Sequence, residues 1–333
     1  KWKEILSIKF DNKIFRFFFR IIFFEALKRN NQKVLIPFRH HSKYLSEKRK
    51  NFFQWQQHDI FDLLDKHQNI IQFKNHEIDK GIKELSRYNI NENDRIILLC
   101  VRDPVYRLKL KNNYFEKEDI VYSNRDCRIS DFENLIKYLC EKNYKVIRMG
   151  KLVHEKIKYS HPNLIDYAFD DKKSDFLDLY LFYISKLVIS TGTGLDALSS
   201  LFRKKRFYIN CGEFSSFSYK LNDNISYVFP KKIFSKIDEK ELSLLEIFEN
   251  NIHKIETKDD KGYDDFIFRS LETNEMISAF ELMEKFIKRG HSKDYLFKNQ
   301  RVNEYLRERY NTNTQMYWSP KYLENTYREL FEK

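Results

Sequence analysis

Cysteine is scarce in this sequence, and the few cysteines present form no metal-binding or disulfide pattern. The four are Cys100, Cys127, Cys140 and Cys211, and no two of them make a C-x-x-C pair. This spacing argues against both a zinc site and a disulfide framework. Cys100 and Cys211 fall in apolar, strand-like runs, where a small buried thiol is the usual explanation. The cysteine usage fits a reducing compartment, and we expect a cytoplasmic protein.

Long hydrophobic runs are also missing. The most apolar stretch, residues 14–27, is shorter than the roughly 20 residues that a bilayer-spanning helix needs, and Arg16, Arg20 and Glu25 interrupt it. A helix there would place the two arginines one turn apart on one side, which is compatible with peripheral contact at the inner membrane. A helix packed in the N-terminal region with its arginines outward explains the same pattern.

Charge is unbalanced in favour of cations. Lys and Arg number 61 against 49 Asp and Glu, and the net charge of +12 favours anionic partners. Lys, Asn, Ile, Phe and Tyr dominate over Gly, Ala and Pro, which A/T-rich codons also produce, so genome composition is an alternative source of the basicity. The charge and the 16% aromatic content suggest a nucleic-acid-binding protein as one hypothesis. No RNP, KH or helix-turn-helix pattern supports it, and we expect no nucleic-acid partner.

The length and the pattern of the chain predict two domains. Its 333 residues, 42% of them hydrophobic, suffice for two cores. The polar, turn-rich segment 87–94 predicts a boundary between an N-terminal α/β region at 1–90, expected to bind the acceptor, and a domain at 91–333. From residue 96 onward strand-like and helix-like patterns alternate, as they do in a parallel sheet with crossover helices. We therefore expect an α/β fold with a Rossmann-like sheet and further helices at its C-terminal end.

Apolar runs predict buried strands, and amphipathic patterns predict the helices between them. The expected strands are residues 33–38, 96–101, 145–149, 163–169, 187–189 and 206–211. The expected helices are residues 44–85, 175–186, 195–202, 241–250, 273–289 and 321–331, with one more that begins at Ser130. Glu133 follows Ser130 by three residues, and this spacing predicts a capping box.

Two of only seven glycines stand in one loop, Ser190-Thr191-Gly192-Thr193-Gly194, between an expected strand and an expected helix. Glycine permits a tight turn, the hydroxyls can donate hydrogen bonds, and a helix N-terminus offers free N–H groups with partial positive charge. These five residues are candidates for binding a phosphate. A capped turn with Thr193 as the N-cap explains the same residues, and the loop is neither a Walker A sequence nor a complete G-x-G-x-x-G fingerprint.

Two more strands are expected to bring charged residues to the same edge of the sheet. Arg102 and Asp103 follow the run at 96–101. Arg148 lies near the end of the run at 145–149, and Gly150 follows that run. Ligand-facing residues of open α/β sheets gather at the carboxyl ends of the strands. An Arg there can form two parallel hydrogen bonds with a phosphate, and Asp103 could orient that Arg or act as a base. A surface ion pair just past a strand is the alternative.

Other candidates are weaker. Asn124 and Arg125 lie in a loop that could add polar groups to the same crevice, or could be solvated. His40 follows an expected strand and could supply a base from the N-terminal region, although an ordinary loop histidine explains it as well. No H-x-x-x-H or D-x-D arrangement points to a catalytic metal, and we expect neither a metal nor a resident cofactor.

The order of these motifs resembles a group of bacterial glycosyltransferases linked to surface-polysaccharide synthesis. The resemblance covers roughly residues 94–331. It rests on short ordered motifs, which are Val101-Arg102-Asp103 with Tyr106, Asn124-Arg125-Asp126, Val146-Ile147-Arg148-Met149-Gly150, Ser190-Thr191-Gly192-Thr193-Gly194, Glu272-Thr273-Asn274-Glu275-Met276 and Trp318-Ser319-Pro320-Lys321-Tyr322-Leu323.

The resemblance implies a GT-B architecture, in which two Rossmann-like halves face each other and the C-terminal half holds a nucleotide sugar. It implies donor diphosphate contacts near Gly192 and Gly194, with Arg102 and Arg148 stabilising the leaving group in place of a metal. Tyr106, with the loop at 124–125, is a further candidate for substrate contact. The expected partners are a nucleotide sugar and a glycan or lipid-linked acceptor. Transfer of a pyruvyl or sulfo group onto a glycan is the rival enzymatic hypothesis.

Overall fold

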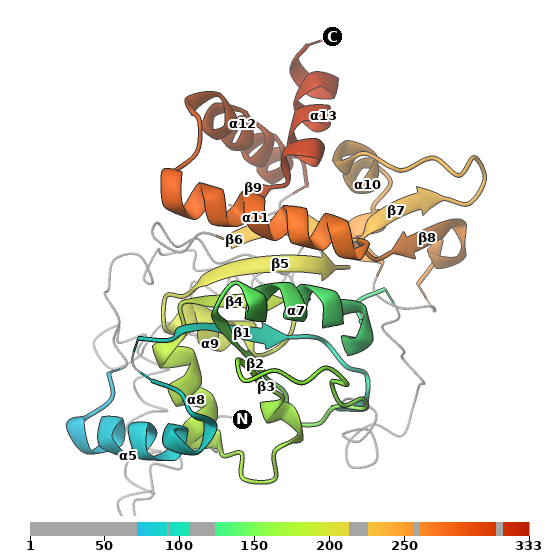
Figure 1. The fold of residues 1–333 in the computed structure, drawn as a ribbon. Coiled ribbons are helices and arrows are strands. Elements are labelled where there is room, and N and C mark those ends of the chain that lie inside the picture. The colour runs from blue at the N-terminus through green and yellow to red at the C-terminus, as the bar shows by residue number, and fades with distance from the viewer. Residues whose placement is uncertain are drawn as a thin grey trace, which may run out of the picture. The chain divides into compact units, whose positions relative to one another are not determined.

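The structure of the chain is a computed structural model, and it describes residues 72–91, 93–106, 124–212, 226–255, 260–310 and 316–332. Its main feature is a seven-stranded sheet with the order β3-β2-β1-β4-β5-β6-β9, in which all neighbouring strands are parallel (Figure 1). The expected α/β fold, with a Rossmann-like parallel sheet and helices, is therefore confirmed. The strand expected at 33–38 and His40 lie outside the described residues. The domain boundary expected near residue 90 stays a prediction.

The strands at the centre of the sheet are the continuous apolar runs of the sequence. Ile96 to Cys100 are all buried, because helices cover both faces of a doubly wound sheet. The strands are β1 (Arg95–Cys100), β2 (Tyr144–Arg148), β3 (Leu164–Ile165), β4 (Leu187–Ser190), β5 (Lys205–Cys211), β6 (Ser226–Pro230) and β9 (Tyr317–Trp318). A separate antiparallel hairpin consists of β7 (Lys232–Ser235) and β8 (Phe266–Arg269).

The chain starts the sheet at its centre and builds outward in both directions. From β1 it proceeds to β2 and β3 on one side, then returns across β1 to add β4, β5 and β6 on the other. The direction of winding therefore reverses between β1 and β4. In open α/β sheets, ligands bind at such a switch point, beyond the carboxyl ends of the strands. The topology alone therefore indicates the carboxyl ends of β1 and β4 as the place to look for a ligand site.

Helices cover the two faces of the sheet. On one face α7 (Glu133–Glu141) and α11 (Thr273–Arg289) pack on Ile97 and Leu99 of β1 (Figure 1). On the other face α5 (Asn75–Leu85), α8 (Asp175–Ile184) and α9 (Asp196–Leu201) pack on Ile96 and Leu98. The alternation of side chains along β1 therefore supplies both cores from one strand.

The C-terminal helices form a third core around Trp318, which is 1% exposed. These helices are α10 (Leu244–Glu249), α12 (Lys293–Tyr310) and α13 (Pro320–Phe331). Two asparagines of α12 fix the tryptophan, since the Trp318 backbone N–H donates to Asn299 at 3.1 Å and its indole N–H donates to Asn303 at 2.9 Å. This core holds β9 at the edge of the sheet.

Two local predictions were wrong. Ser130 and Glu133 form no capping box, because Ile129–Phe132 is a 3-10 turn and α7 begins only at Glu133. The Glu133 carboxylate instead accepts the backbone N–H of Lys158 at 2.9 Å, so a contact distant in sequence replaces the local cap. The strand expected at 163–169 is reduced to the two residues of β3, followed by a 3-10 turn at Tyr167–Phe169.

Helix α5 packs closely on α8 through a glycine. A Cβ placed on Gly81 would lie 2.4 Å from ring carbons of Tyr180, and real Cβ contacts are not that short. The Tyr180 ring is 3% exposed and also contacts the rings of Phe73 and Phe176, so it has little room to move. Glycine is disfavoured in a helix interior, and its presence here is explained by the close approach.

We therefore expect Gly81→Ala to lower the free energy of unfolding by about 1–2 kcal/mol, measured by chemical denaturation. Overpacking typically costs about 1–3 kcal/mol, which exceeds the roughly 0.5–1 kcal/mol that alanine gains in a helix. In a Tyr180→Ala background the same substitution should be neutral or stabilising. An equal loss in both backgrounds would show that the ring contact is not the cause.

Candidate functional site

The carboxyl ends of β1 and β4 are joined at the switch point by hydrogen bonds that continue beyond the strands. Cys100 and Ser190 are the last register partners of the two strands. The Thr191 backbone N–H then donates to the Cys100 carbonyl at 3.1 Å, and the Arg102 backbone N–H donates to Thr191 Oγ1 at 2.8 Å. The structure thus brings together Arg102 and the loop 190–194, two sets of residues that the sequence singled out independently.

The loop satisfies most of its own backbone N–H groups. Gly192 has a φ of 90°, in the left-handed region that favours glycine. Its N–H donates to Ser190 Oγ at 3.1 Å, and the Thr193 N–H donates to the Asp196 carboxylate at 2.9 Å. The helix after the loop has Leu195, not Thr193, as its N-cap, while Thr193 Oγ1 accepts the Leu195 N–H at 3.3 Å. The shape of the loop is therefore held by the hydroxyls of Ser190 and Thr193 and by the carboxylate of Asp196 in the helix that follows.

Gly194 is the exception within the loop. Its N–H makes no hydrogen bond among the residues that the structure describes. A Cβ placed on Gly194 would meet nothing within 4 Å, so the backbone at this position faces open space. The several loop amides expected to face a phosphate are thus reduced to one, which is unpaired within the described residues and belongs to an exposed glycine.

Asp196, in the helix after the loop, binds the loop through its side chain. Its side chain is buried, accepts the Thr193 N–H, and also interacts with the Ser190 hydroxyl. Burial raises the pKa of this carboxyl above its ordinary value, while hydrogen bonds from Ser190 and Thr193 act in the opposite direction. Asp196 was not among the residues predicted from the sequence. Its position two residues after Gly194, in the first turn of a helix, is a signal that could have identified it.

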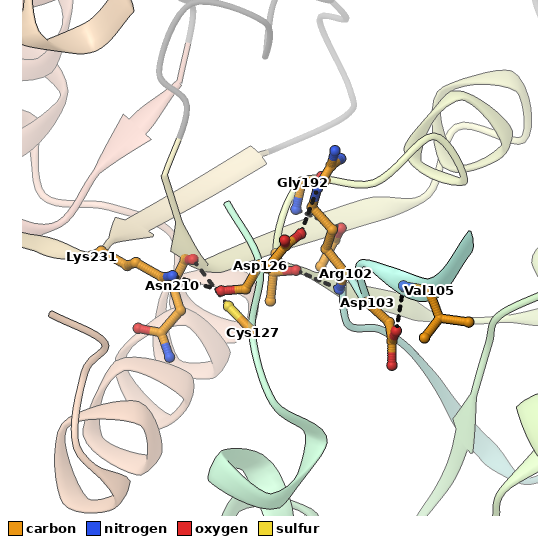
Figure 2. A network of polar contacts seen from close by, with 10 residues as sticks. Arg102, Asp103, Val105, Asp126, Cys127, Gly192, Asn210 and Lys231 are labelled. Atoms are coloured by element: carbon orange, nitrogen blue, oxygen red, sulfur yellow. Dashed lines mark hydrogen bonds and ion pairs between the residues drawn. The ribbon is translucent and has the colours of Figure 1, made fainter. Parts of the chain in front are cut away.

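Arg102 lies between the loop and an acidic residue of the segment 124–128 (Figure 2). Its Nε donates to Asp126 Oδ1 at 3.2 Å, and its Nη1 lies 3.4 Å from the Gly192 carbonyl. The Arg102 side chain is 15% exposed and the Asp126 side chain 17% exposed, so the pair is only partly open to a ligand. The guanidinium thus links β1, the 124–128 segment and the loop after β4.

Lys231, which directly follows β6, completes this group, and no sequence pattern pointed to it. It is 5% exposed, and its Nζ donates to the Asp126 backbone carbonyl at 2.8 Å (Figure 2). Burial raises the pKa of the Asp126 carboxyl, and the charges of Arg102 and Lys231 oppose this shift. Lys231 and Arg102 therefore both bind Asp126 at the switch point, the ammonium at its backbone carbonyl and the guanidinium at its carboxylate.

Arg148 does not join this group. It is 1% exposed, and its Nη1 donates to the Glu155 carbonyl at 2.5 Å and lies 3.5 Å from Asp166 Oδ1. Burial lowers the pKa of the guanidinium, and Asp166 counteracts that effect. Arg148 therefore ties β2 to the segment 155–166, a structural role that differs from the expected phosphate contact. Gly150 has a packing role, since a Cβ there would lie 2.8 Å from Val153.

The other predicted residues have separate environments. Both Asp103 oxygens accept backbone N–H groups, from Val105 at 2.9 Å and from His154 at 2.7 Å, so this carboxylate fixes two loops against each other. Asn124 is 1% exposed and donates to the Ile255 carbonyl, away from Arg102. Tyr106 is 44% exposed, and Arg125 is half-buried.

Within the described ranges, no group of three or more His, Cys, Asp or Glu side chains is placed to hold a metal ion. In the same part of the chain, none of the helices combines the length and the apolar character needed to cross a membrane. The candidate functional site is the group at the switch point, which consists of Arg102, Asp126, Lys231 and the loop 190–194.

Because Arg148 is buried, we expect Asp166→Ala to lower the free energy of unfolding by about 3–5 kcal/mol, the usual cost of leaving one charge of a buried pair unpaired. The matched control is Asp175→Ala, which breaks an ion pair of 2.7 Å with Lys151 in which the carboxylate is 87% exposed. That control should cost at most about 1 kcal/mol. Urea denaturation compares the two variants, and similar losses would contradict the assignment of Arg148 as a buried structural residue.

The raised pKa of Asp196 gives a pH dependence. The folded protein binds this proton more tightly than the unfolded chain does, so protonation of Asp196 favours folding. Asp196→Asn lacks the titration. The stability of the wild type relative to this variant should therefore rise as the pH falls from 7 toward the ordinary Asp value of 3.8. Urea denaturation of both proteins at several pH values measures the difference, and a pH-independent difference would contradict the burial of this carboxylate.

The chain was compared with models of protein families, with curated proteins and with solved structures. None of the three comparisons gives a match.

Proposed function

We propose that this chain is a glycosyltransferase that binds a nucleotide-activated sugar at the ends of β1 and β4 and transfers the sugar to a glycan or lipid-linked acceptor. The observation that carries the proposal is the meeting of Arg102 with the loop 190–194 at the switch point. Nucleotides bind at this position in doubly wound sheets. On this proposal, the described sheet is the nucleotide-binding half of a GT-B architecture, and the motifs resembling surface-polysaccharide glycosyltransferases supply the reaction class.

The proposed chemistry is displacement at the anomeric carbon. The acceptor oxygen forms the new bond, and the bond between that carbon and the donor phosphate oxygen breaks. The nucleoside diphosphate departs with the electron pair, so negative charge increases on the phosphate during the reaction. Arg102 and the free N–H of Gly194 would bind this oxygen, and the Lys231 ammonium would add longer-range stabilisation. The acceptor's proton leaves to a base that the proposal does not assign.

A calorimetric titration with UDP, GDP, dTDP and CDP tests the donor site. We expect one of these nucleotides to bind, and we expect Arg102→Ala to weaken its binding by about 10- to 100-fold, the range for one charged hydrogen-bonding partner. Arg289→Ala is the matched control, because Arg289 is an exposed arginine on α11. Thermal unfolding of all three proteins establishes that they are folded. Equal affinities in wild type and Arg102→Ala would contradict the proposed site.

The same titration separates the rival reaction classes. Adenosine 3',5'-bisphosphate represents a sulfo donor and phosphoenolpyruvate represents a pyruvyl donor. Exclusive binding of either one, weakened by Arg102→Ala, would replace the glycosyltransferase assignment while keeping the anion site. If one of the four nucleoside diphosphates binds instead, its base identifies the nucleotide sugars to screen as donors.

A further inference from the structure

A hollow of about 1100 Å³ lies at the amino-terminal edge of the sheet, the edge opposite to the candidate site. It is lined by the first residues of β1, β2, β4 and β5, and by α5 and α11 from the two faces of the sheet. Small-molecule sites are typically about 300–1000 Å³, so the hollow has room for a sizeable ligand. None of its lining residues belongs to the switch-point group.

The helical walls of the hollow are apolar. Ile78 and Ile82 of α5 face it from one side, and Met283 and Ile287 of α11 line the other. Ile82 is 44% exposed, although large apolar side chains on a helix are usually covered. These walls favour the apolar part of a ligand.

The polar lining is strongly cationic. It includes six Lys or Arg side chains and a single carboxylate, that of Glu284. Glu284 is already shared, because its Oε1 lies 3.1 Å from Arg95 and 3.0 Å from Lys288. The remaining cations are at the opposite end of the hollow, where β4 and β5 begin, and they have no carboxylate of the hollow beside them.

Part of this positive charge has an ordinary structural explanation. Parallel sheets place the C-terminal ends of their helices at this edge, and those ends attract cations. Lys204 Nζ donates to the Tyr183 carbonyl at 2.6 Å near the end of α8, and Arg203 donates to the Ser200 carbonyl at 2.8 Å near the end of α9. Two of the cations are therefore accounted for by helix ends.

The other two cations at this end are not accounted for in that way. The ammonium groups of Lys186 and Lys205 make no polar contact within the described part of the chain. Burial and the neighbouring Lys186 lower the pKa of Lys204 to about 8. A lysine loses part of its charge in this way where local negative charge is insufficient. The end of the hollow at β4 and β5 is therefore short of an anion.

We propose that this hollow binds an amphiphile with a phosphate head and an apolar chain. The phosphate lies between Lys186, Lys204 and Lys205, and the chain extends along the apolar walls of α5 and α11. The ligand chemistry is shared by membrane lipids and by free phosphate-bearing amphiphiles. This inference does not rest on the proposed transferase activity, because the two sites are at opposite edges of the sheet.

Calorimetric titration of the full chain with decyl phosphate tests the proposal, at concentrations below micelle formation. We expect saturation at one molecule per chain, and about tenfold weaker binding of octyl phosphate, since two fewer methylene groups are buried. Decyltrimethylammonium, with the opposite charge, should not bind. Inorganic phosphate that binds as tightly as decyl phosphate, or a cationic amphiphile that binds equally well, would overturn the proposal.

Two variants at exposed positions locate the ligand without disturbing the core. Lys186→Glu and Ile82→Asp should each weaken decyl phosphate binding at least tenfold, whereas Lys261→Glu, a charge reversal at another exposed lysine, should not. Unchanged affinity in both test variants would overturn the proposal. Arg102→Ala should retain decyl phosphate binding, so failure here is distinguishable from failure of the nucleotide site.

Vesicles distinguish the two sources of the ligand. Co-sedimentation with phosphatidic acid vesicles that is lost in Lys186→Glu, and absent with phosphatidylcholine vesicles, identifies a membrane lipid. Binding of monomeric decyl phosphate without vesicle binding identifies a free amphiphile. Either result supports the site, because each requires both the phosphate and the apolar chain.

Discussion

The pairing of β1 with β4 is the constraint on which the rest of the domain depends. β1 is buried on both faces, and its two sets of side chains enter two different cores. The same strand therefore holds helices on both sides of the sheet and determines where the winding reverses. Because the hydrogen bonding continues past Cys100 to Thr191 and Arg102, the candidate site is positioned by the sheet itself. A site on regular elements is held more precisely than one on independent loops.

The net charge of +12 has different consequences at the two edges of the sheet. At the carboxyl edge, Arg102 and Lys231 are balanced in part by Asp126, and the loop rests on a second buried acid, Asp196. At the amino edge, helix ends supply only carbonyl oxygens, and one carboxylate serves the whole hollow. The cations of a basic composition are therefore balanced differently at the two edges, and the bare charge count could not reveal this difference.

Much of the fold could be predicted from the sequence, because its central strands are continuous apolar runs. The helix expected at 273–289 is confirmed as α11 with the same bounds. What was missed depends on contacts distant in sequence. β9 has only two residues and pairs through the core around Trp318, and α12, which supports that core, is a mainly polar helix. The Glu133 cap failed for the same reason, since a distant backbone N–H competed for the carboxylate.

Motifs in the sequence could not distinguish the two arginines predicted for the candidate site. Arg102 and Arg148 both follow apolar runs, and the sequence alone treats them alike. The register separates them, because Arg148 is paired with Leu99 inside the sheet, whereas Arg102 lies two residues beyond the end of β1. At the level of Leu99 helices cover both faces, so the Arg148 guanidinium has no route to solvent and must find Asp166 and the Glu155 carbonyl. Beyond the strand end, the Arg102 side chain is 15% exposed and contacts Asp126 and the Gly192 carbonyl. The alignment of neighbouring strands, which no single motif encodes, decides which of the two arginines is fully buried.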